Sequence, residues 1–188
     1  PHSRANQRDI DYTYPRHLEF ESFSQQFQLY WVRDQANIII TGSSQIGKNW
    51  LASALAVEAI VKGLKVKAYR IDKFLNDINE ARSRLAKNGK PEIVRLEQEL
   101  FKLDVLYLHG LGACELDDNQ LRDLEDVVRL LHGETSFLIT SPVATHTWKE
   151  YFEYTYLGES IVNRLLGRGI VFDLAGEPYT RFPEQARN

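Results

Sequence analysis

A run of β-branched residues leads directly into a loop with two glycines and then into a helix rich in Ala and Leu. The run Asn37-Ile-Ile-Ile-Thr41 is typical of a buried strand, and residues 48–61 have the composition of a helix. Between them lies Gly42-Ser43-Ser44-Gln45-Ile46-Gly47-Lys48-Asn49, which fits the phosphate-binding loop pattern through its lysine but not at its last position. Glycines let backbone N–H groups turn toward phosphate oxygens, and the helix N-terminus adds its dipole. The alternative is an ordinary glycine turn that caps a helix, but the strand before it and the helix after it favour phosphate binding.

The alternation of strand and helix continues along the chain. Further strands are expected at 65–71, 104–109, 136–140 and 169–174. Further helices are expected at 73–87, 92–102, 118–131, 146–154 and 159–166. This order predicts an α/β three-layer sandwich in which a five-stranded, mostly parallel sheet is covered on both faces.

Two parts of the chain differ in composition. Residues 1–30 are polar and aromatic without a clear period, and we expect them to form an N-terminal arm. The side chains expected to pack this arm on the domain are Tyr12, Tyr14, Leu18, Phe20, Phe23 and Phe27. Residues 31–188 are expected to form one P-loop domain, since no linker divides them.

Composition excludes several classes of protein. The net charge of −3 excludes a globally basic nucleic-acid binder, although it permits a local basic surface. The single cysteine, Cys114, excludes an intrachain disulfide and favours a cytoplasmic setting. The longest apolar run, residues 51–61, is interrupted by Glu58 and is too short to span a bilayer, so no membrane partner is expected.

Two positions that normally hold Mg²⁺ beside a phosphate-binding loop have changed. Asn49 replaces the Ser or Thr that coordinates the metal, and an amide is poorly matched to octahedral Mg²⁺. The strand at 104–109 ends in His109 and Gly110, where an NTPase has an acidic residue. The spacing of His109 and Cys114 is not a zinc pattern either. The residues therefore predict no metal site and no identifiable catalytic group, and they predict impaired Mg²⁺-dependent hydrolysis.

Several blocks of the sequence resemble IstB, the ATPase subunit of insertion-sequence transposition, and its relative the helicase loader DnaC, both of the AAA+ class. The blocks are residues 40–55, residues 103–112, residues 138–141 followed by Trp148, residues 161–166 and residues 176–181. The resemblance covers about residues 9 to 181. It implies an AAA+ fold, ATP or ADP as ligand, and an oligomer on DNA that uses ATP to organise a transposase or a replicative helicase.

The departures from this family fall on positions with chemical roles. They are Gln45 in place of Gly, Asn49, His109 and Gly110 as above, Pro142 in place of a polar sensor residue, and Asn163 in place of Asp. Lys48 remains, as do two late arginines, Arg164 and Arg181. The resemblance implies that these three, together with the loop 42–49 and the adjoining Trp50, contact the nucleotide.

Two stretches carry opposite local charge. Residues 61–90 are strongly basic, while residues 115–126 are acidic. The DNA-binding candidates in the basic stretch are Lys62, Lys65, Lys67, Arg70, Lys73, Arg82 and Arg84. A basic stripe of this size neutralises phosphates and gives a salt-dependent affinity, whereas the alternative is an ordinary solvated surface. The acidic stretch is interpreted either as surface or as an edge that meets a basic neighbouring subunit.

Three hypotheses about function remain open at this point. The first is an IstB/DnaC-like nucleotide-binding protein that acts with DNA and a partner protein in transposition or replication. The second is a pseudo-ATPase of the same lineage, a scaffold or regulatory subunit that assembles with an active ATPase and binds little or no nucleotide. The third is an unrelated nucleotide-binding module that shares only the loop.

Overall fold

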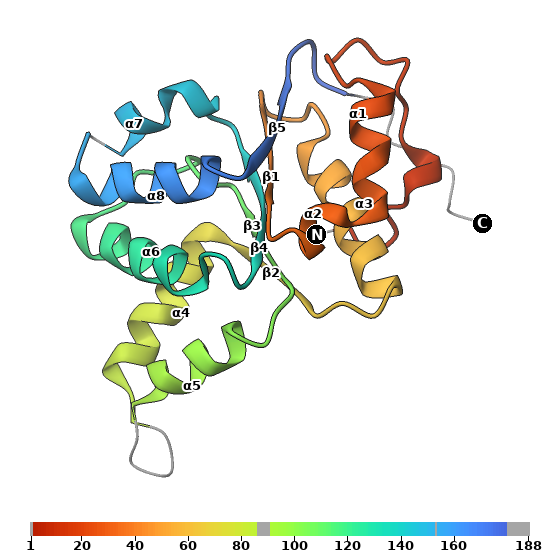
Figure 1. Cartoon of the computed structure of the whole chain (residues 1–188). Coiled ribbons are helices and arrows are strands. Elements are labelled where there is room, and N and C mark those ends of the chain that lie inside the picture. The colour runs from red at the N-terminus through yellow and green to blue at the C-terminus, as the bar shows by residue number, and fades with distance from the viewer. Residues whose placement is uncertain (1, 86–90, 153, 180–188) are drawn as a thin grey trace.

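Five parallel strands form one sheet in the order β2-β3-β4-β1-β5 in the computed structural model, which describes residues 2–85, 91–152 and 154–179 (Figure 1). The strands are β1 (Asn37–Gly42), β2 (Val66–Arg70), β3 (Val105–His109), β4 (Ser136–Ser141) and β5 (Gly169–Leu174). Every neighbouring pair is parallel, so all five carboxyl ends lie at one edge of the sheet. The predicted α/β architecture with five strands is confirmed.

The interior strand β1, which lies between β4 and β5, shows why this sheet must be covered on both faces. Ile38, Ile39 and Ile40 are fully buried. Because successive side chains of a strand point to opposite faces, Ile38 and Ile40 join one hydrophobic cluster while Ile39 joins the other. The β-branched run seen in the sequence is therefore the place where the two clusters meet.

Two helical layers cover the sheet (Figure 1). One face carries α3 (Lys48–Val61) together with two short helices of the N-terminal arm, α1 (Phe20–Ser24) and η2 (Gln25–Gln28), and the helix that follows the arm, α2 (Tyr30–Arg33). The opposite face carries α4 (Ile71–Ser83), α6 (Asp118–Leu131) and α8 (Tyr156–Leu166), with α5 (Glu92–Leu100) packed against α4. The remaining helical turns are η1 (Gln7–Asp9), η3 (Thr145–Thr147) and α7 (Trp148–Tyr151). No helix of the described ranges has the length and apolar character needed to cross a membrane.

The N-terminal arm packs on the domain mostly as expected. Leu18, Phe23 and Phe27 are buried in the cluster that also holds α3. Phe20 is a correction, because 59% of it is exposed and its ring lies edge-on against Tyr12 at the surface. The arm thus supplies much of one helical layer.

Some element boundaries differ from the sequence prediction. α4 begins at Ile71 and ends at Ser83, and residues 86–90, at the end of the predicted helix 73–87, lie outside the described residues. The predicted helix 146–154 is instead η3 followed by the single turn of α7. α8 begins at Tyr156 rather than 159, because the Thr155 hydroxyl caps it by accepting the amide of Gly158 at 3.0 Å.

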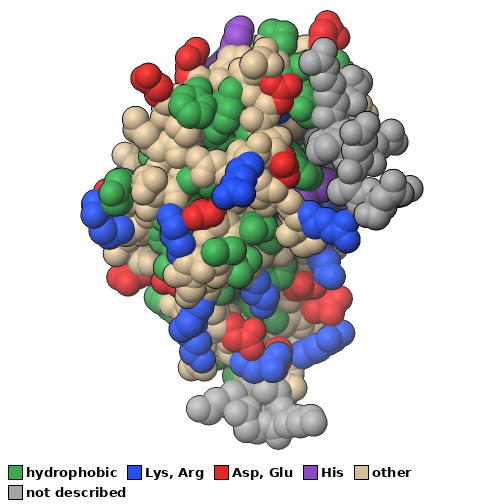
Figure 2. Space-filling model, turned by 90° about the vertical axis from the view of Figure 1, so that its right-hand side faces the viewer, with side chains coloured by type: hydrophobic (Ala, Val, Ile, Leu, Met, Phe, Trp, Pro, Cys, Tyr) green, Lys and Arg blue, Asp and Glu red, His purple; other side chains and the backbone are tan. Residues whose placement is uncertain are grey.

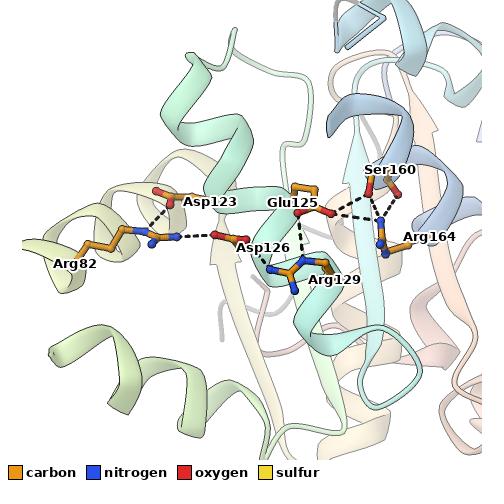
Figure 3. A network of polar contacts seen from close by, with 7 residues as sticks. All are labelled: Arg82, Asp123, Glu125, Asp126, Arg129, Ser160 and Arg164. Carbon is orange, nitrogen blue, oxygen red and sulfur yellow. Dashed lines mark hydrogen bonds and ion pairs between the residues drawn. The ribbon is translucent and has the colours of Figure 1, made fainter. Parts of the chain in front are cut away.

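A network of polar contacts, formed by charged side chains and one serine, joins α4, α6 and α8 (Figure 3). Its members are Arg82, Asp123, Glu125, Asp126, Arg129, Ser160 and Arg164. Arg82 of α4 donates to Asp123 at 2.7 Å and to Asp126 at 2.9 Å. Burial raises the pKa of Asp123, while Arg82 opposes that shift. Much of the acidic stretch therefore meets arginines of its own chain, and this part is neither plain surface nor an unpaired edge for a neighbour.

Candidate phosphate-binding site

The loop between β1 and α3 has the backbone of a phosphate cradle. Gly42 and Gly47 have φ values of 135° and 101°, which side-chain-bearing residues rarely adopt. A Cβ at Gly42 would also lie 2.4 Å from the carbonyl oxygen of Leu174 on β5. Both glycines of the sequence pattern are therefore required by the turn itself.

The amide groups of this loop are available to a ligand. Residues 43–45 are exposed, while Ile46 is fully buried and anchors the loop in the core. Among the described residues, none accepts a hydrogen bond from the backbone N–H groups of residues 44–47. These donors lie at the N-terminus of α3, a helix of 14 residues, where the helix dipole favours an anion.

Lys48 is folded over its own loop. Its Nζ donates to the carbonyl oxygens of Gly42 at 2.7 Å and Ser43 at 2.6 Å. Partial burial lowers the pKa of the Lys48 ammonium. The side chain is thus a partly buried cation at the mouth of the loop, held by two carbonyl oxygens of the loop itself.

Asn49 lies where a hydroxyl would coordinate Mg²⁺, but its oxygen is already engaged. Oδ1 accepts a hydrogen bond from the hydroxyl of Thr140 on β4 at 2.8 Å. The carboxamide oxygen is the only atom of this side chain suited to a hard cation, so metal binding here requires breaking that bond. In the described part of the chain, no group of three or more His, Cys, Asp or Glu side chains is arranged to hold a metal ion.

The ends of β3 and β4 bring the other degenerate positions close to Asn49. His109 pairs in register with Thr140, and the amide of Gly110 donates to the Thr140 carbonyl at 2.9 Å. Burial lowers the pKa of His109, which favours its neutral form. Gly110 has φ 84°, so an acidic side chain at this position would strain the backbone. Pro142 is exposed just after β4 and offers no side-chain hydrogen bond.

Arg164, one of the two late arginines, does not reach the loop within the described structure. Arg164 contacts Glu125 at 3.4 Å and the backbone oxygen of Ser160 at 3.2 Å (Figure 3). Its own carbonyl accepts from Asn37, the first residue of β1, whereas the phosphate loop follows the last residue of that strand, about 17 Å away along it. Arg181 lies outside the described residues. Trp50 is half-buried on α3, with its ring 5.4 Å from the ring of His2 in the arm.

The DNA-binding candidates do not form one free basic stripe. Five of the seven are in ion pairs, namely Lys62 with Glu58, Lys67 with Glu99, Arg70 with Asp72, Arg82 with Asp123 and Asp126, and Arg84 with Glu80. Lys65 and Lys73 are exposed and have no ion pair within the described ranges. On the face drawn in Figure 2, Lys and Arg side chains lie among acidic and hydrophobic ones. The sequence count of basic residues therefore overstates the local field.

Sequence reasoning missed Arg16, which lies directly behind the loop. The residue is 2% exposed, and its Nη1 donates to the carbonyl of Ile46 at 3.2 Å. A signal was present, because Tyr12, Tyr14, Arg16 and Leu18 alternate along the arm and share its inward side, while the residues between Tyr14 and Leu18 other than Arg16 are exposed. A charged residue at one position of an otherwise apolar alternation suggests an exposed side chain, so the burial of Arg16 was not expected.

Comparison with known families settles the lineage. A family model described as IstB-like ATP binding protein matches residues 1–186. The chain belongs to this IstB-like family. The hypothesis of an unrelated module that shares only the loop is therefore wrong.

Curated relatives of this IstB-like chain come from several bacteria. The insertion sequence ATP-binding protein y4pL of Sinorhizobium fredii is 28% identical over 178 residues, which cover 95% of this chain and 70% of that protein. The IS1162 ATP-binding protein of Pseudomonas fluorescens is 31% identical over 117 residues, covering 62% of this chain and 48% of that protein. The IS5376 ATP-binding protein of Geobacillus stearothermophilus is 27% identical over 173 residues, which cover 90% of this chain and 65% of that protein. The chain thus spans 48% to 70% of the length of these relatives.

Solved structures similar to the IstB-like chain share its fold. A crystal structure of DnaI superposes with a TM-score of 0.71 at 16% identity, covering 92% of each chain. AMPPCP-bound DnaA from Aquifex aeolicus superposes with a TM-score of 0.70 at 18% identity, and the match covers 92% of this chain and 50% of the DnaA chain. The DnaC helicase loader superposes with a TM-score of 0.67 at 15% identity, and the match covers 82% of this chain and 87% of the DnaC chain. The fold is therefore the P-loop fold of AAA+ type.

Proposed function

We propose that this IstB-like protein binds ATP or ADP, acts with DNA and a transposase in insertion-sequence transposition, and hydrolyses ATP very slowly or not at all. The observation that carries the proposal is the contrast at the site. The loop keeps the features of a phosphate cradle, because the N–H groups of residues 44–47 have no acceptor among the described residues and a lysine lies at its mouth. The positions that hold Mg²⁺ and orient water in a P-loop NTPase have changed here. The oxygen of Asn49 is bound to Thr140, and β3 ends in His109 rather than in a carboxylate.

Nucleotide binding without efficient hydrolysis follows from the separate roles of these two parts. Backbone amides, the helix dipole and Lys48 attract phosphate charge without a metal. In P-loop NTPases, Mg²⁺ is held by the loop Ser or Thr and an acidic residue at the end of a neighbouring strand, and it neutralises the charge that develops during phosphoryl transfer. A chain with the first part and without the second is suited to being a nucleotide-dependent switch or assembly subunit.

A second candidate function is a scaffold that binds no nucleotide and assembles with an intact ATPase, either as a homo-oligomer or as a hetero-oligomer. It is favoured by the two carbonyl contacts of Lys48, which fill part of the phosphate loop with its own side chain. The two functions differ in one measurable property, which is the affinity for nucleotide.

Calorimetric titration with ATP and ADP, each with and without Mg²⁺, tests the proposal. We expect saturable binding of both nucleotides, with dissociation constants that change less than about threefold when Mg²⁺ is removed, because the oxygen of Asn49 is engaged and the end of β3 carries no carboxylate for the metal. Undetectable binding at millimolar nucleotide would exclude the proposed function and leave the scaffold.

The proposed contact with DNA rests on Lys65 and Lys73, two exposed lysines that form no ion pair within the described ranges. Each free lysine that meets a phosphate should add about one unit to the salt slope of the affinity. We expect Lys65→Glu and Lys73→Glu each to weaken binding of fluorescent duplex DNA at low salt by several-fold, while Lys149→Glu on α7, an exposed lysine of another element, changes it little. An affinity that is undetectable at low salt, or equal in all variants, contradicts this part.

A further inference from the structure

Arg16 is a buried cation placed against the phosphate loop by the N-terminal arm. Besides the bond from Nη1 to the Ile46 carbonyl, its Nη2 donates to the carbonyl of Asp11 at 3.0 Å. A Cβ on Gly47 would lie 2.5 Å from Nη1. The guanidinium thus rests on the turn of the loop that immediately precedes Lys48.

Among the described residues Arg16 forms no ion pair, although the carboxylate of Asp11 acts on its charge from beyond contact distance. Within the part of the chain that the structure describes, no carboxylate lies within 4.0 Å of the guanidinium, and its buried Nε has no hydrogen-bond acceptor. The guanidinium carbon lies 4.9 Å from the centre of the Tyr179 ring. This cation–π contact stabilises the charge of Arg16 less than an ion pair with a carboxylate would. Burial lowers the pKa of Arg16, as expected for a cation withdrawn from water.

The same residue joins three segments that are distant in sequence. The amide of Ala175 donates to the Arg16 carbonyl at 3.3 Å, and the amide of Tyr179 donates to the carbonyl of Gln45 at 2.9 Å. The arm, the loop and the segment after β5 therefore hold one another at this point. Any displacement of the arm withdraws a hydrogen-bond donor from the loop.

We propose that Arg16 is a positioning residue for the phosphate loop and that its unpaired charge couples docking of the arm to binding of polyphosphate. The inference rests on the proposed nucleotide binding and adds its regulation. A buried cation with no carboxylate in contact is costly, and an anion bound on the outer side of the loop adds negative charge close to it. Nucleotide then stabilises the docked arm, and the docked arm raises the affinity for nucleotide by the same factor.

The test compares Arg16→Met, which keeps an apolar side chain of similar length, with Arg16→Lys, which keeps the charge. Arg33→Met is the matched control, because the side chain of Arg33 is 70% exposed, lies just after the arm, and contacts only its neighbours Asp34 and Tyr30 among the described residues. Thermal unfolding first establishes that each variant is folded. Calorimetry then gives the affinities for ATP and AMP, and amide hydrogen exchange reports on residues 42–48 without nucleotide.

For Arg16→Met we expect a loss of about tenfold in ATP affinity and a smaller loss for AMP, since a charge effect grows with the phosphate charge. Arg16→Lys should recover most of this ATP-to-AMP preference, because it restores the charge. Exchange of residues 42–48 should be faster in Arg16→Met than in the wild type, while Arg33→Met should match the wild type in every measurement.

Three outcomes would overturn the inference. One is wild-type exchange at residues 42–48 in Arg16→Met. Another is an equal loss of ATP and AMP affinity that Arg16→Lys does not restore, which is the result of a purely structural role. The third is an Arg33→Met variant that behaves like Arg16→Met. A wild-type protein that binds no nucleotide refutes the proposed function instead, and the exchange measurement still decides whether Arg16 positions the loop.

Discussion

Lys48→Ala is expected to lower the affinity for ATP by about 100-fold, the largest single effect in the site. The lysine is the only side-chain cation at the mouth of the loop among the described residues, and it is partly desolvated, so its charge-assisted bonds to phosphate are strong. Calorimetric titration of wild type and variant with ATP measures the change directly.

Lys62→Ala is the matched control for this result. Lys62 follows the other end of the same helix α3, where it pairs with Glu58 and donates to the carbonyl of Phe27. We expect this variant to bind ATP within about twofold of the wild type, because a charge on the far side of a 14-residue helix is largely screened. If Lys48→Ala also retained affinity within that margin, any nucleotide bound would not sit in the loop.

The wild-type protein is expected to hydrolyse ATP no faster than the Lys48→Ala variant, even with Mg²⁺ and DNA present. The cause is the absence of a carboxylate at the end of β3, where His109 is held toward its neutral form, together with the engaged oxygen of Asn49. Phosphate release measured over hours at saturating ATP provides the test. DNA-stimulated turnover that disappears in Lys48→Ala would contradict it.

A double variant, Asn49→Thr with His109→Asp, separates the two parts of this explanation. It restores a hydroxyl and a carboxylate, the two metal contacts of an ordinary P-loop NTPase. We expect ATP affinity to become Mg²⁺-dependent by roughly tenfold while turnover stays low, because Gly110 has φ 84° and cannot accept a second acidic residue without strain. Asn49→Thr alone is the control, and it should gain less Mg²⁺ dependence because it restores one metal contact of the two.

Local sequence pattern predicted the elements that depend on one short segment. The β-branched run of β1, the glycine turn and α3 were confirmed, because a buried strand, a positive φ and a helix each require particular residues at adjacent positions. The degeneracy of the metal side was also visible, since a missing carboxylate is a property of composition at a single position. Boundaries such as the start of α8 were less well predicted, because a Thr hydroxyl fixes them through one hydrogen bond.

Interactions between distant segments were decided by the tertiary structure. The basic stretch looked free along the chain, yet Arg82 is paired with α6, 41 positions away. Arg164 is directed to Glu125 and not to the loop within this chain. The interaction energy of two charges depends on their distance in space and on their burial, and the order of residues along the chain gives neither.

The sequence by itself determined that this is a P-loop protein of the IstB lineage whose third strand ends in His109 rather than an acidic residue, because the loop, the helix and the strand ends are encoded by residues close together in the chain. Only the tertiary structure decided that Thr140 occupies the oxygen of Asn49 and that Arg16, 30 positions before Ile46, supports the loop from behind. The physical reason is that hydrogen bonds and buried charges act over a few ångströms, and only folding brings such segments within that range.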